Sequence, residues 1–140
     1  MRIVLDTNVV LDLVVFRDPG VGALRAAIEA ARVKPLASDA SLDELRRVLA
    51  YPAFELDPSS QDTAFGWYES QALLVEAPPA IAFLPRCRDA DDQKFLDLAW
   101  AANAAHLVTK DKALLELARR VARLGRFSVT PPAGLQLPAA

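Results

Sequence analysis

Short apolar runs and longer amphipathic segments alternate along the chain. The runs suit strands buried on both faces, and the longer segments repeat apolar residues every three or four positions, as helices do. The expected strands are residues 3–5, 35–37, 107–109 and 127–129, with 73–75 fitting a strand or a helix end and 81–84 a weak extended segment. The expected helices are residues 9–15, 21–31, 38–50, a segment after 57–60, 89–105, and a basic segment between 111 and 125. This alternation predicts an α/β fold: a three-layer sandwich whose central, mostly parallel β-sheet is flanked by helices.

Length and composition narrow the class of protein. With 140 residues, 53% of them hydrophobic, the chain can form one domain, residues 1–140, with its own core. The single cysteine, Cys87, excludes an internal disulfide and cannot alone make a cysteine-cluster zinc site. No apolar run approaches the roughly 20 residues of a membrane span. We therefore expect a cytoplasmic protein that does not interact with membranes.

The net charge of −2 conceals an uneven distribution of charge. Between Arg47 and Arg86 there are acidic residues and no basic ones, whereas residues 110–126 hold six basic side chains against Asp111 and Glu116. A basic segment of this kind can meet a phosphate backbone. The alternative is that these side chains form a solvent-exposed helix face without a partner. The charge distribution alone favours that alternative.

Four acidic residues share one predicted location. Asp6 ends the first strand, Asp111 follows the strand at 107–109, Asp92 lies near the start of a helix, and Glu44 lies in the helix after the second strand. The carboxyl ends of parallel strands lie at one edge of the sheet, where ligand sites form. All four carboxylates can therefore converge there.

Several of these acids also have a purely structural interpretation. Asp6, Asp89 and Asp111 each stand where a turn or helix-cap residue could stand, and taken alone Asp111 fits a cap better than a site. Glu44 has the spacing of a capping-box residue, but a helix that starts at Ser38 places it in the second turn instead. The capping explanation is therefore weakest for Glu44.

Asp92 shares a predicted helix face with Phe95, Leu96 and Ala99. A carboxylate on the buried side is unfavourable unless something pairs with it. The only histidine is His106, and spacing forces no Lys or Arg into the site. Carboxylates without a histidine or thiolate cluster suit hard ions such as Mg²⁺ or Mn²⁺, which assist phosphoryl displacement. The chemistry indicated is phosphodiester hydrolysis.

Four segments resemble those of the PIN-domain nucleases, in the branch of VapC-like toxins of toxin–antitoxin systems. They are residues 3–8, 41–49, 87–96 and 107–115, and the closing 129–131 is also similar. The resemblance implies a PIN-like fold and a Mg²⁺- or Mn²⁺-dependent endoribonuclease that hydrolyses single-stranded RNA and leaves a 5′-phosphate. The alternative is a PIN-like module that binds RNA or protein without catalysis. A mutually repelling set of four acids argues against that alternative.

The resemblance also implies roles for individual residues. Asp6, Glu44, Asp92 and Asp111 would be both catalytic and metal-binding, with Asp6 and Asp92 holding the main ion. Glu44 and Asp111 would complete its shell or hold a second ion. Asp89 would be a further metal ligand or a cap that positions Asp92.

The resemblance also implies which residues support the metal site and which bind partners. Asn8 and Thr109 would orient the carboxylates of Asp6 and Asp111. The candidates for RNA binding are Lys112, Arg119, Arg120 and Arg123, and those for an antitoxin interface are Arg46 and Arg47. The expected partners are single-stranded RNA, a cognate antitoxin and a second copy of the chain. The homodimer is expected because the first two helices, Phe65 and Trp67 hold more apolar residues than a core of this size can hide.

Three other α/β families fit the sequence poorly. A haloacid-dehalogenase-like phosphatase needs a second Asp where Asn8 stands. A phospho-receiver domain needs adjacent acids after its first strand and an acceptor Asp after its third, and both are missing. A dinucleotide-binding domain needs a glycine turn that Gly20 and Gly22 do not supply.

Overall fold

The computed structural model describes residues 1–140 and is built on a sheet of five parallel strands. The strands are β1 (Arg2–Leu5), β2 (Lys34–Ala37), β3 (Leu73–Leu74), β4 (His106–Val108) and β5 (Ser128–Thr130), in the order β3-β2-β1-β4-β5. β1 is central, and its Ile3 lies opposite Pro35 of β2 and His106 of β4. The predicted α/β class is confirmed. The segment at 73–75 provides an edge strand, whereas 81–84 forms turns and no strand.

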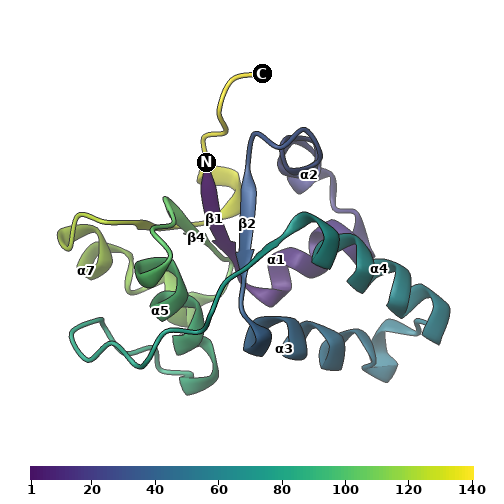
Figure 1. The fold of residues 1–140 in the computed structure, drawn as a ribbon, viewed down its shortest axis with the longest axis horizontal. Helices are drawn as coiled ribbons and strands as arrows, with labels where there is room; N and C mark the ends of the chain where they lie inside the picture. The colour runs from purple at the N-terminus through teal and green to yellow at the C-terminus, as the bar shows by residue number, and fades with distance from the viewer.

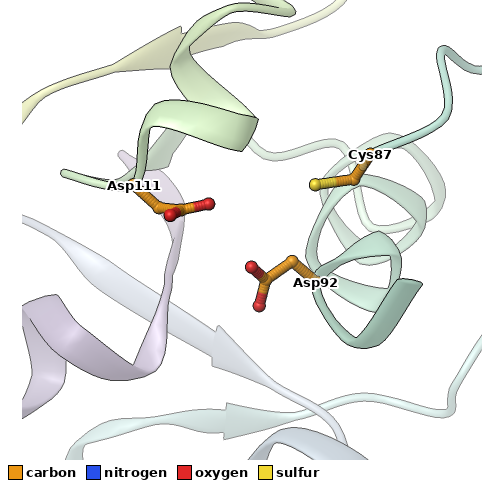
Figure 2. Close-up of side chains that lie close together, drawn as sticks. All are labelled: Cys87, Asp92 and Asp111. Atoms are coloured by element: carbon orange, nitrogen blue, oxygen red, sulfur yellow. The ribbon is translucent and has the colours of Figure 1, made fainter. Parts of the chain in front are cut away.

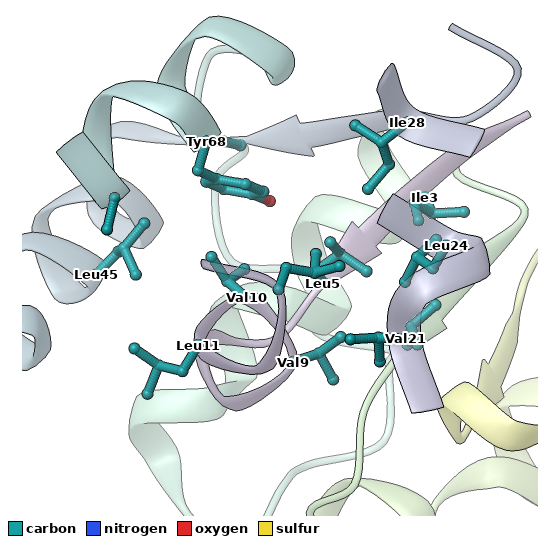
Figure 3. Close-up of a cluster of buried hydrophobic side chains, with 14 of the residues drawn as sticks. Ile3, Leu5, Val9, Val10, Leu11, Val21, Leu24, Ile28, Leu45 and Tyr68 are labelled. Atoms are coloured by element: carbon teal, nitrogen blue, oxygen red, sulfur yellow. The ribbon is translucent and has the colours of Figure 1, made fainter. Parts of the chain in front are cut away.

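Four helices cover one face of the sheet (Figure 1). They are α1 (Thr7–Leu11), α2 (Gly22–Glu29), α3 (Asp39–Leu49) and α4 (Pro58–Gln71), and α1 continues into a π-helical turn, Asp12–Phe16. Figure 3 shows Ile3 and Leu5 of β1 packed among side chains of these helices, including Ile28 of α2, Leu45 of α3 and Tyr68 of α4. This apolar cluster holds α1 and α3 against the sheet, next to the end of β1.

The second face carries α5 (Gln93–Ala101), α6 (Lys112–Leu115) and α7 (Ala118–Arg123). Successive strand residues point to opposite faces, so Val4 and Leu107 join this second core while their neighbours join the first. Phe95 of α5, Leu114 of α6 and Val121 of α7 pack with them. Apolar strands buried on both faces explain why the runs in the sequence are continuous rather than alternating.

Two of the predicted helices are divided in the structure. The segment expected at 89–105 begins with a 3-10 turn, Ala90–Asp92, before α5 starts at Gln93. The basic segment after Asp111 is split into α6 and α7, and at the junction the Leu117 N–H donates to the Leu114 carbonyl at 3.0 Å, three residues back rather than four. This tighter turn breaks the helical register and separates the arginines of α7 from α6.

The start of α3 follows its expected signal. The Ser38 hydroxyl accepts from the Ser41 N–H at 3.2 Å, and the Ser41 hydroxyl accepts from the Ser38 N–H at 3.0 Å, which is a capping box. Glu44 therefore lies in the second turn of α3 and does not cap the helix.

The apolar residues that suggested a homodimer are mostly inside the fold. The apolar residues of α1 are buried, and Phe65 is only 9% exposed. The Arg46 guanidinium lies 3.9 Å from the centre of the Phe65 ring, and that of Arg25 lies 4.0 Å from the centre of the Trp67 ring. These residues therefore do not leave the exposed apolar surface on which the expected homodimer was based. None of the helices has the length and apolar character that a membrane crossing requires.

Candidate functional site

A cleft of about 300 Å³ lies at the carboxyl edge of the sheet. Eleven residues line it: Asp6, Thr7, Asn8, Leu11, Glu44, Val48, Tyr51, Phe54, Asp89, Asp92 and Asp111. The sequence-predicted quartet and Asp89 are thus brought to one place, although they are spread over more than 100 residues. They reach it from the end of β1, the second turn of α3, the turn before α5 and the loop after β4.

Asp6 is a carboxylate held firmly in a buried position. It is 3% exposed, and its Oδ1 accepts from the Val9 N–H at 2.9 Å. The Thr109 hydroxyl donates to its Oδ2. Burial raises the pKa of Asp6, while the bonds from Thr109 and Val9 act in the opposite direction. The side chain therefore has one fixed orientation at the base of the cleft.

Thr109 links two of the candidate ligands. Its buried hydroxyl donates to Asp6 and accepts from the Asp111 backbone N–H at 3.0 Å, so it positions both residues after neighbouring strands. Asn8 was expected to share this role, but the structure does not place it so. Its side chain is exposed at the cleft, and the hydrogen bonds to Asp6 come from Val9 and Thr109. The first turn of α1 directs Asn8 outward, whereas Thr109 is buried beneath the site.

Asp111 does not serve as the helix cap that its position suggested. It precedes α6 with the extended backbone of a cap residue, but its side chain makes no capping hydrogen bond. Its Oδ2 is buried and has no hydrogen-bond partner. A buried polar atom left unpaired costs about 1–3 kcal/mol. The structure therefore holds a carboxylate oxygen in the cleft whose natural partner would be a cation.

Asp92 is partly buried among three other acidic side chains of the cleft. Burial raises the pKa of this carboxyl to about 6, and the charges of Asp89, Asp111 and Glu44 act in the same direction. The Asp89 side chain accepts from the Asp91 N–H at 3.0 Å, so it caps the 3-10 turn that presents Asp92. The carboxylate of Asp92 is thus held where a cation would relieve its repulsion from three neighbours.

Glu44 is paired with a lysine that the sequence did not single out. Its Oε1 lies 2.9 Å from Lys94 Nζ, and the Thr7 hydroxyl donates to its Oε2. Lys94 also donates to the Asp91 carbonyl, and its charge lowers the pKa of Asp92. A lysine is therefore present beside the cleft, although its spacing in the sequence did not place it there. The pairing joins α3 to α5, fifty residues apart, and no local pattern could have shown it.

Cys87 is a second residue that sequence reasoning missed. Its sulfur and one carboxylate oxygen each from Asp92 and Asp111 lie within 4.8 Å of one another, and Figure 2 shows the three side chains facing a common gap. Cys87 is 8% exposed, and burial raises the pKa of its thiol. Its place inside the 87–96 segment, two residues before Asp89, was the one available signal.

A second hollow of about 420 Å³ adjoins the cleft and shares Asn8 and Asp111 with it. It is also lined by Asp12, Phe16, Lys110 and Lys112. Lys110 forms an ion pair with Asp12, a buried acid in the π-helical turn that the sequence analysis did not consider. Of the four predicted RNA-binding residues, only Lys112 lies here. Those on α7, Arg119, Arg120 and Arg123, are exposed and line neither hollow.

The cleft fits a hard divalent ion by the chemistry of its donors. Several carboxylates meet without a histidine, and one of them has a buried oxygen with no partner. Oxygen ligands of this kind are those that Mg²⁺ and Mn²⁺ prefer. Asp6, Glu44, Asp92 and Asp111 could hold such an ion, with Asp89 at its margin.

Two solved structures share this fold at low sequence identity. One is a chain of VapBC2 from Rickettsia felis, bound to a DNA fragment from their promoter: the TM-score is 0.63 at 14% identity, covering 94% of this chain and 98% of that chain. The other is a chain of FitAB bound to an IR36 DNA fragment. Its TM-score is 0.58 at 17% identity, and the match covers 96% of this chain and 97% of that chain. No curated protein matches the sequence.

The sequence itself matches one domain family. The profile of the PIN domain matches residues 2–113, which include β1, β4 and every acidic residue of the cleft. Because the match spans most of the chain, the chain belongs to the PIN domain family.

Proposed function

We propose that this chain is a Mg²⁺- or Mn²⁺-dependent endoribonuclease that hydrolyses single-stranded RNA. PIN domains are generally nucleases, which supports hydrolysis of a nucleic acid. The observation that carries the proposal is the unpaired, buried Oδ2 of Asp111 in a cleft where acidic side chains from four parts of the chain meet. Folding brings these like charges together at a cost in stability, which a bound cation would offset.

The proposed roles follow from the contacts of each side chain. Asp6, Glu44, Asp92 and Asp111 would hold the ion, which when bound neutralises charge on a phosphate and favours attack by water. Thr109 keeps Asp6 in one orientation and fixes the backbone of Asp111. This prior positioning reduces the reorganisation needed when substrate binds.

Aromatic side chains at the rim support a single-stranded substrate. Tyr51 and Phe54 line the cleft and Phe16 lines the adjoining hollow, with ring centres 5.6 Å apart for Phe16–Phe54 and 6.3 Å for Tyr51–Phe54. Tyr51 is 46% exposed and Phe16 is 55% exposed. Exposed rings beside a phosphate site can stack on bases that are free of a duplex. A paired strand would keep its bases out of reach of these rings.

The direct test is cleavage of end-labelled RNA by the full chain. We expect single-stranded RNA to be cut with Mn²⁺ or Mg²⁺ but not with excess chelator, and Asp6→Asn to slow cleavage by roughly 100-fold or more. Asp91→Asn is the matched control, because Asp91 is exposed and does not line the cleft. Equal cleavage with chelator, or by Asp6→Asn, would overturn the proposal. RNA binding with no cleavage in either metal would instead identify an inactive binding module.

We also propose that the chain is the toxin of a toxin–antitoxin pair and forms a homodimer. The support for the toxin role is the PIN domain family together with the likeness in fold to chains of VapBC2 and FitAB. The support for the dimer is the exposure of large apolar side chains, among them Leu74 and Phe83. Co-expression with the product of a neighbouring small open reading frame should give a co-purifying complex with suppressed RNA cleavage. Sedimentation of the free chain should show a dimer. Failure to bind that product would contradict the antitoxin role, and a monomer at micromolar concentration would contradict the dimer.

A further inference from the structure

The thiol of Cys87 faces the acidic cleft and has no role in the proposed reaction. Its sulfur shares a gap with oxygens of Asp92 and Asp111, all within 4.8 Å of one another (Figure 2). Zinc binds sulfur at about 2.3 Å and oxygen at about 2.0–2.2 Å in tetrahedral geometry, so two ligand atoms of one ion lie roughly 3.5 Å apart. Movements of about 1 Å would therefore bring the three side chains to the spacing of a metal's ligands.

The position of Cys87 is built into the fold. Its backbone N–H donates to Gln93 Oε1 at 2.8 Å, and Gln93 Nε2 donates to the Pro85 carbonyl at 3.2 Å. Gln93 is the first residue of α5, so this double contact ties the loop carrying Cys87 to the helix that follows Asp92. The backbone that carries the thiol is therefore fixed next to the turn that carries Asp92.

Two independent features indicate that this gap accepts a cation. Cys87 is 8% exposed, which places a metal-binding sulfur inside the protein and facing the acids. Across the gap, Asp111 presents a buried oxygen with no hydrogen-bond partner. The lysines near the gap are paired with other acids, Lys94 with Glu44 and Lys110 with Asp12. Arg88, whose charge interacts with Cys87 and Asp111, forms its ion pair with Glu116.

We propose that Cys87, Asp92 and Asp111 form a mixed thiolate–carboxylate site for a thiophilic d-block ion such as Zn²⁺ or Co²⁺. Thiolate ligands favour such ions and are poor ligands for Mg²⁺. Binding would release the thiol proton to solvent. Since Asp92 and Asp111 are shared with the proposed Mg²⁺ or Mn²⁺ site, Zn²⁺ would displace the hard ion. This consequence, inhibition of RNA cleavage by Zn²⁺, rests on the proposed function, whereas the site itself does not.

The test is the absorption spectrum of the metal-free full chain titrated with Co²⁺. A cobalt–thiolate bond gives a charge-transfer band in the near ultraviolet, which carboxylates alone do not give. We expect this band in the wild type and in Asp91→Asn, and its loss in Cys87→Ser. By calorimetry, Cys87→Ser should weaken Zn²⁺ binding by roughly tenfold or more and leave Mn²⁺ binding within about twofold.

The outcomes separate this proposal from the proposed function. Absence of the band from the wild type would overturn the cysteine site even if Mn²⁺-dependent RNA cleavage is observed. A band that persists in Cys87→Ser would also overturn it, because Cys87 is the only cysteine. Conversely, a band in a protein that never cleaves RNA would support the site and reject the nuclease. If Cys87→Ser does not fold, the wild-type spectrum still decides, with Asp92→Asn expected to shift the band and weaken Co²⁺ binding.

Discussion

Asp92 shows at the scale of one residue how the cleft favours function over stability. Its pKa is raised from 3.8 to about 6 by burial and by neighbouring acids. A carboxyl with a raised pKa binds more protons in the folded state than in the unfolded state between about pH 4 and pH 6. Its stabilising contribution is therefore present below about pH 4 and is lost as the pH rises through about 6.

Asp92→Asn should accordingly stabilise the metal-free protein at pH 7. We expect a gain of about 1 kcal/mol or less, because solvent screens this partly exposed group, and no gain near pH 4. Thermal unfolding at both pH values measures the effect, with the exposed Asp91→Asn as control. In the wild type Mn²⁺ should raise the melting temperature, and in Asp92→Asn it should not. A lower melting temperature for metal-free Asp92→Asn at pH 7 would contradict this account.

Asp111 offers a second test at residue scale, because its two interpretations predict opposite results. Removing a helix cap costs about 0.5–2 kcal/mol. The structure shows no capping bond and an unpaired buried oxygen, so Asp111→Ala should leave the metal-free protein as stable or make it more stable. Urea unfolding without metal provides the measurement, and Asp57→Ala is the comparison, since Asp57 does cap α4 through the Ser60 N–H at 2.7 Å. Equal losses in both variants would restore the capping interpretation.

At the scale of elements, α3 joins the core to the cleft. Leu45 is 1% exposed in the core beneath the sheet, and the adjacent Glu44 faces Thr7 and Lys94. Leu45→Ala should lower the free energy of unfolding by about 2–5 kcal/mol through the cavity that it leaves. Arg47→Ala, at an exposed position of the same helix, should change it by about 0.5 kcal/mol or less. A loss below about 1 kcal/mol for Leu45→Ala would show that α3 is not anchored as described.

The elements differ in how well local sequence predicts them. The helix start at Ser38 and that of α4 at Asp57–Pro58 are local signals, and the structure has both. The division between α6 and α7 has no such signal, because a hydrogen bond at Leu117 set by packing interrupts a continuous amphipathic pattern. Periodicity reports which face is buried, but it does not report where a helix bends to follow the sheet.

At the scale of the whole molecule, only one of the four predicted RNA-binding residues lies beside the cleft. Lys112 lies beside the acidic cleft, whereas the three arginines of α7 line neither hollow. We expect Lys112→Ala to weaken binding of single-stranded RNA and to lower the slope of log affinity against log salt by about 0.7. The combined substitution of Arg119, Arg120 and Arg123 by alanine should leave that slope unchanged. Fluorescence anisotropy at several salt concentrations measures both, and the reverse result would place the RNA path over α7.

The sequence by itself determined the α/β architecture and the meeting of distant acids. The architecture follows from the spacing of apolar residues, and the meeting of the acids follows from the order of strands and helices along the chain. Strand β1 ends at Leu5, where its apolar run ends, and parallel strands place the residues that follow them, such as Asp6 and Asp111, at one edge of the sheet. Only the tertiary structure decided what surrounds those acids. Cys87 faces them, and Lys94 pairs with Glu44, through side-chain directions across separate elements. Such contacts depend on packing angles and rotamers that no spacing along the chain encodes.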